Sequence, residues 1–82
     1  MDIHNLLQMA NRIGQFFESM PDGEEATKEI AVHLRKFWEP RMRSALLAHV
    51  DATGGEGLLP IVGRAVVAHR EMLQVQPERA LR

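Results

Sequence analysis

The chain has no cysteine and no tyrosine among its 82 residues, and its aromatic residues are three phenylalanines and one tryptophan. Without cysteine it can form neither a disulfide framework nor a thiolate metal site, and nothing indicates an oxidising compartment. A domain of this length buries only roughly 60% of the surface that its unfolded chain exposes. Its core is therefore small, and contact with another protein is the remaining source of stability.

The chain also lacks an excess of charge of one sign, because 10 Lys and Arg residues stand against 11 Asp and Glu residues. This balance argues against a surface adapted as a whole to nucleic acid or to an anionic membrane. No stretch approaches the roughly 18 apolar residues of a membrane helix, and the first residues lack the regions of a signal peptide. We therefore expect a cytoplasmic protein with no nucleic-acid and no membrane partner.

The apolar residues that are present follow a helical spacing. Between Asp2 and Met20 they recur at three- and four-residue steps, which is the period of an amphipathic helix. Asp2 can cap the start of this helix, and Pro21 disfavours helical geometry in the residue before it. Asp22, with Glu25 three residues later, is a variant of the capping box and predicts the start of a second helix.

Proline and glycine mark the remaining boundaries. Pro40 and Pro60 suit the first turns of two further helices, and the glycines between Gly54 and Gly57 indicate a helix stop and a loop. Glu39–Pro40 could be a sharp corner or a kink, which distinguishes a four-helix from a three-helix arrangement. We predict a single all-α domain of residues 1–82, a small bundle of three to four helices at about 2–20, 23–38, 40–52 and 59–75, with a frayed tail at 77–82.

Gly14 lies inside the first predicted helix, where glycine costs roughly 1 kcal/mol relative to alanine. One interpretation is that another element packs closely against it, and the other is that the glycine is simply tolerated. We favour the second interpretation, and no function depends on it.

The sequence offers few groups for catalysis or metal binding. Its four histidines lie on four different predicted segments, without the i, i+4 spacing of a helical zinc pair: His4, His33, His49 and His69. Neither serine lies in a glycine-rich elbow, and helix capping explains the acidic pair Glu24–Glu25. The glycines at 54–57 lack the spacing of a phosphate-binding loop. We therefore predict no catalytic residue, no metal ligand and no enzymatic activity of the chain itself.

The segment His33–Arg43 carries residue types beyond those that a core needs. It contains four cations, one carboxylate, two aromatic residues and a proline. Tryptophan and arginine are enriched among interface hot spots. Adjacent helical positions point about 100° apart, so we expect Phe37 in the core and Trp38 on a contact surface with the arginines. The predicted partner-binding residues of this segment are Phe37, Trp38, Glu39, Pro40, Arg41 and Arg43.

Four stretches resemble one known family. They are LQMANRIGQFF at 7–17, HLRKFWEPRMR at 33–43, LLAH at 46–49 and LLPIV at 58–62. Together they are similar to the delta subunit of the soluble, NAD-dependent, molybdenum- or tungsten-containing formate dehydrogenases of bacteria. The resemblance extends from Leu7 to about Ala68, and the run Phe-Trp-Glu-Pro-Arg-Met is its most specific part.

The resemblance implies a role beside an enzyme. In that family the alpha subunit carries bis-molybdopterin guanine dinucleotide and iron–sulfur clusters, and the beta and gamma subunits pass electrons to NAD through FMN. The delta subunit is a small accessory. The resemblance therefore implies a non-catalytic accessory subunit, binding the alpha subunit and supporting its assembly, stability or cofactor loading, with no cofactor of its own.

One alternative is a chaperone that binds the bis-molybdopterin guanine dinucleotide cofactor directly. Its phosphates would be received by the cations of the same segment, because guanidinium groups suit phosphate: Arg35, Lys36, Arg41 and Arg43. Self-association also stays open, since an isolated subunit could cover its partner-binding face with a copy of itself. A helical nucleic-acid regulator is disfavoured, because no turn of three to four residues separates the helices that flank Pro40.

Overall fold

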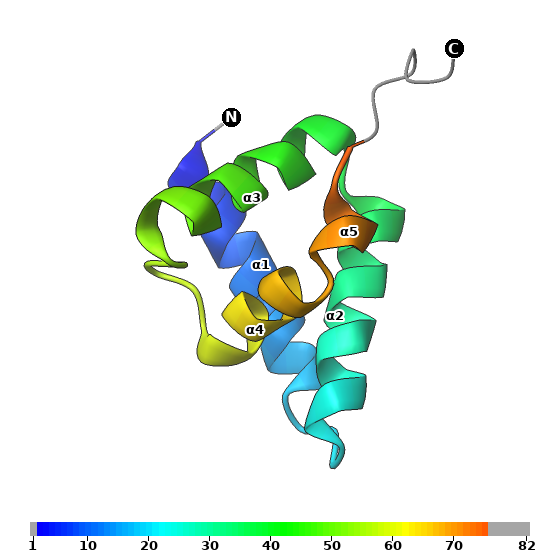
Figure 1. Ribbon diagram of the computed structural model, residues 1–82. Helices are drawn as coiled ribbons and strands as arrows, with labels where there is room; N and C mark the ends of the chain where they lie inside the picture. Colours follow the sequence, from blue (N-terminus) through cyan, green and yellow to red (C-terminus); the bar gives the residue numbers. More distant parts are fainter. Residues whose placement is uncertain (1, 76–82) are drawn as a thin grey trace, which may run out of the picture.

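The computed structural model describes residues 2–75, and all of the regular structure in that range is helical. The all-α prediction is therefore confirmed. The described range holds five helices rather than three or four, and the fifth is a single short turn (Figure 1): α1 (Ile3–Phe17), α2 (Gly23–Phe37), α3 (Pro40–Thr53), α4 (Pro60–Ala68) and α5 (Arg70–Leu73). The predicted frayed tail at 77–82 lies outside the described residues.

The first two helices form an antiparallel hairpin (Figure 1). Both begin as predicted, because the Asp2 carboxylate accepts the His4 N–H at 3.0 Å and the Asp22 carboxylate accepts the Glu24 N–H at 3.0 Å. Helix α1 ends at Phe17, and the prediction of residue 20 was wrong. The Met20 N–H donates to the Phe17 carbonyl at 3.1 Å, which closes a tight turn in place of further helix.

Glu39–Pro40 is a corner between α2 and α3. Trp38 (φ −91°, ψ 138°) and Glu39 (φ −64°, ψ 152°) are both extended. Pro40 imposes this geometry on Glu39 and then serves as the first residue of α3, where its missing N–H costs nothing. Helix α3 crosses to pack on α1 and ends at Thr53, where it is capped by Gly54, whose φ of 77° is the left-handed conformation that glycine adopts readily.

The predicted helix at 59–75 is two helices. His69 leaves helical geometry (φ −118°, ψ 35°), and its carbonyl accepts the N–H groups of Met72 and Leu73, which starts α5. No glycine or proline marks this break, and the apolar spacing continues through it. The sequence pattern therefore does not predict the break. The change of direction brings Leu73 into the core, where α5 packs against α2 and α3.

Helix α4 packs across α1 and α2 and contributes four buried side chains, Ile61, Val62, Ala65 and Val66. Its approach to α1 is close at Gly14, where a Cβ atom would overlap Val62 Cγ2 and would lie 3.4 Å from Ile61 Cγ2. The interpretation of Gly14 as merely tolerated was therefore wrong. Within residues 2–75, none of the helices has the length and hydropathy needed to cross a membrane.

Candidate interaction surface

Phe37 and Trp38 have the opposite roles to those predicted. Phe37 is 69% exposed, and Trp38 is only 6% exposed. Buried residues recur along α2 at four-residue steps, and Trp38 continues the series Ala26, Ile30 and Leu34. Phe37 lies about 100° to one side of it. The expectation of Phe37 in the core and of Trp38 on the surface was wrong, because the side chain that extends the apolar stripe takes the core position.

Arg43 is buried as well, with 5% of its surface exposed. Its Nη1 donates to the Arg35 carbonyl at 3.2 Å, and this carbonyl lies in the last turn of α2, where no further helical N–H can reach it. Within residues 2–75 the Arg43 Nε has no hydrogen-bond partner. Burial, and then the charge of Arg35, lower the pKa of Arg43 from its ordinary value. Arg43 thus caps α2 and fastens the corner.

The predicted segment is therefore divided between core and surface. Trp38 and Arg43 hold the corner and offer no surface to a partner. The other predicted partner-binding residues are exposed: Phe37, Glu39, Pro40 and Arg41. Of the four cations considered for cofactor phosphates, Arg35, Lys36 and Arg41 are exposed, but Arg43 is buried and bound to a backbone carbonyl. The four do not form one phosphate cradle, so the chain does not fit that cofactor in the way expected.

Phe37 is one end of a row of four aromatic rings from α1 and α2, which we call the aromatic row. Phe16 and Phe17 meet edge to face with ring centroids 4.9 Å apart, Phe17 and His33 lie 6.3 Å apart, and His33 and Phe37 lie 4.7 Å apart. The two ends are the most open, since Phe16 is 75% exposed and Phe37 is 69% exposed. Phe17 and His33 are half-buried between them.

The exposure of Phe16 has a signal in the sequence that the prediction did not use. Phe16 lies on the apolar spacing of α1, but it is adjacent to Phe17, and two neighbouring helical positions cannot both point to the centre of one narrow apolar face. Gly14 faces α4, and Phe16, two residues later, points about 200° away from it, so Phe16 lies on the side of α1 opposite α4. The same reasoning was applied to Phe37 and Trp38 and would have predicted one exposed phenylalanine in α1.

Beside the row is a shallow pocket of about 290 Å³, which we call the row pocket. Its walls are Arg12, Ile13, Phe16, Phe17 and His33. This volume is at the lower limit of pockets that bind small molecules and suits a protein side chain better. The row pocket is thus a hollow bounded by three of the four rings of the aromatic row.

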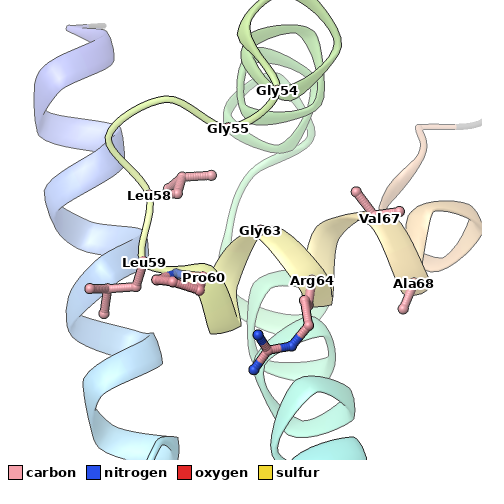
Figure 2. Close-up of a pocket in the computed structure, with 9 residues that line it drawn as sticks. All are labelled: Gly54, Gly55, Leu58, Leu59, Pro60, Gly63, Arg64, Val67 and Ala68. Carbon is pink, nitrogen blue, oxygen red and sulfur yellow. The ribbon is translucent and has the colours of Figure 1, made fainter.

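A second hollow, of about 540 Å³, lies over α4 (Figure 2). It is lined by the Gly54–Gly55 turn, Leu58, Leu59, Pro60 and the outer residues of α4, among which Val67 is 64% exposed. The Arg64 guanidinium extends away from the two glycines in Figure 2, so it does not combine with them into a phosphate site.

The loop that forms this second hollow is fastened to the bundle. The Asn11 Nδ2 donates to the Gly57 carbonyl and the Asn11 Oδ1 accepts the Leu59 N–H, each at 2.9 Å. His49 Nε2 donates to the Glu56 carbonyl at 2.6 Å. The side chains of Asn11 and His49 therefore serve the fold, and residues 2–75 contain no group of three potential ligands placed to hold a metal ion.

Residues 5–66 match the family model described as the NADH-dependent formate dehydrogenase delta subunit FdsD. The chain belongs to this family. The match includes α2, α3, most of α1 and α4, and the whole aromatic row, and it confirms the resemblance found in the sequence. No protein of curated function and no experimentally solved structure matches the chain.

Proposed function

We propose that the chain is a non-catalytic accessory subunit of a soluble, cytoplasmic, NAD-dependent formate dehydrogenase. It binds the catalytic alpha subunit and supports its assembly, its stability or the loading of its cofactor. The bis-molybdopterin guanine dinucleotide, the iron–sulfur clusters, FMN and NAD belong to the other subunits. Membership of the delta-subunit family over residues 5–66 supports the association with this enzyme.

The observation that carries a contact role is the exposure of Phe16 and Phe37 at the two ends of the aromatic row. A phenylalanine in water forgoes roughly 1.5–3 kcal/mol of burial, and large exposed apolar groups that gather in one place mark interaction sites. Because the rings come from two helices of one hairpin, they present a continuous surface. The exposed part of the corner, Glu39, Pro40 and Arg41, follows Phe37 directly in the sequence.

Co-purification tests the proposal. The tagged chain is co-expressed with the other subunits, and the recovered alpha subunit, its molybdenum or tungsten content and its formate oxidation are measured. The double variant Phe16→Ala/Phe37→Ala should recover at least about tenfold less alpha subunit, because each truncation at a hot spot costs at least about 2 kcal/mol and about 1.4 kcal/mol is a factor of ten.

Val67→Ala is the matched control, since this side chain is 64% exposed on α4, away from the row. It should leave recovery unchanged, and circular dichroism should show that both variants fold. Equal recovery of alpha subunit and equal cofactor content with the double variant would contradict the proposed contact surface. Failure of the unaltered chain to bind any formate dehydrogenase subunit would contradict the proposed function itself.

A further inference from the structure

The row pocket combines apolar walls with one arginine. Ile13, Phe16 and Phe17 supply the apolar walls, and Arg12 lies exposed at the pocket beside them. The one ion pair within residues 2–75 joins Arg70 to Asp51. No carboxylate of that range therefore lies within ion-pair distance of Arg12. The pocket therefore has a cation that its own surroundings leave without a counter-ion.

The charges around the row indicate what could cover it. Helix α1 contains no aspartate or glutamate, and α2 ends next to the row with the basic residues Arg35 and Lys36. Three acids lie within four residues of a ring of the row, Glu18, Glu29 and Glu39, and none of them forms an ion pair with Arg12. A purely apolar cover would remove water from Arg12 without replacing its hydrogen bonds, which is costly for a charged group.

A second copy of the chain would be a poor cover. In a symmetric dimer the same patch meets itself, so a patch with the cations Arg12, Arg35 and Lys36 beside its rings would face a second patch of the same predominantly basic character. Like charges that face each other across an interface disfavour the complex. The occupant must instead bring negative charge together with an apolar group.

We propose that the row pocket receives an apolar side chain of the catalytic subunit that stands next to an Asp or Glu carboxylate, with this carboxylate paired to Arg12. The side chain fills the hollow between Phe16, Phe17 and His33. The neighbouring carboxylate replaces the water on the Arg12 guanidinium, and Lys36 favours the same negatively charged segment. This inference rests on the proposed function, because it takes the catalytic subunit as the partner.

Photo-crosslinking in the assembled complex tests which molecule occupies the pocket. Phe16 is replaced by p-benzoylphenylalanine, the complex is irradiated, and the crosslinked peptide is identified by mass spectrometry. The expected product joins position 16 to a catalytic-subunit peptide that contains an apolar residue next to Asp or Glu. The same probe at Val67 should not reach that peptide. A product that joins position 16 to a second copy of the chain, or to a segment without a carboxylate, would overturn the proposal.

A charge exchange tests the ion pair. Arg12→Glu should weaken binding of the catalytic subunit by about fivefold or more at low salt, and the loss should shrink at high salt, where exposed charges are screened. Reversal of the crosslinked carboxylate to arginine should restore binding of the Arg12→Glu chain. The control is Arg64→Glu, which reverses an exposed charge on α4 and should change binding less than about twofold.

The two proposals fail in different ways. In one outcome the unaltered chain binds the catalytic subunit and Arg12→Glu binds equally well, and in another the charge-exchanged pair of variants does not restore binding. In either case the row pocket is not the binding site, and the accessory role stands. If the unaltered chain does not bind at all, the accessory role fails first.

Discussion

Substitution of Gly14 by alanine sets two opposing effects of known size against each other. In an exposed helix this change would stabilise α1 by roughly 1 kcal/mol, because alanine is the better helix former. At Gly14 the new methyl group would overlap Val62 Cγ2 and would lie 3.4 Å from Ile61 Cγ2 and 3.6 Å from Leu59 Cδ1. The structure must shift to make room, and overpacking of a core costs about 1–3 kcal/mol.

The cost should be near the upper end of that range. Val62 is fully buried, and a valine in a helix has essentially one side-chain rotamer, so it cannot rotate away from the new methyl group. The net expectation is a loss of about 1–2 kcal/mol in the free energy of unfolding. For a domain of this size each kcal/mol lowers Tm by about 4–8 °C, so Tm should fall by about 5–15 °C.

Urea unfolding followed by circular dichroism measures this change for Gly14→Ala, Val62→Ala and the double variant. The double variant should lose at least about 1 kcal/mol less than the sum of the single losses, because the methyl group introduced at position 14 then occupies space that Val62 vacates. A Gly14→Ala chain that is more stable than the original by about 1 kcal/mol would refute the close contact between α1 and α4, since helix propensity alone would then govern the position.

Two further predictions concern the corner and the loop. Trp38→Ala should lower the free energy of unfolding in urea by about 3–5 kcal/mol, because it empties a buried site. Phe37→Ala should change it by less than about 0.5 kcal/mol, because this side chain is exposed. Similar losses for the two variants would contradict the burial of Trp38 and the exposure of Phe37. Asn11→Ala should cost about 1–3 kcal/mol and should speed hydrogen exchange at the Leu59 amide, because that N–H loses its acceptor. Unchanged exchange at Leu59 would contradict the hydrogen bond between Asn11 and Leu59.

The helix starts could be predicted from the sequence because local chemistry fixes them. The Asp22 carboxylate accepts a hydrogen bond from an N–H group two residues later, and Pro40 restricts the backbone conformation of the residue before it. Neither effect depends on the tertiary structure. The break at His69 has no such local cause. It depends on the core that Leu73 enters, and the apolar spacing alone does not contain that information.

The surface was harder to predict than the fold. Periodicity shows that Phe37 and Trp38 differ in direction, but which of them is buried depends on where the apolar face of α2 meets α1, α4 and α5. The aromatic row depends on the pairing of α1 with α2, which brings Phe17 to His33 although the two are far apart in the sequence. The predicted segment at 33–43 thus contains one end of the candidate surface, and Arg12 and Phe16 complete it from the other helix.

The bond from Arg43 to the Arg35 carbonyl has a consequence for recognition. It ties α3 to the last turn of α2, the turn that carries Phe37, so the backbone beneath this exposed ring cannot fray as a free helix end would. A side chain on a fixed backbone has already lost much of the freedom that binding would otherwise remove. In the proposed contact Phe37 would therefore meet the partner preorganised, and the buried Arg43 would contribute to affinity without touching the partner.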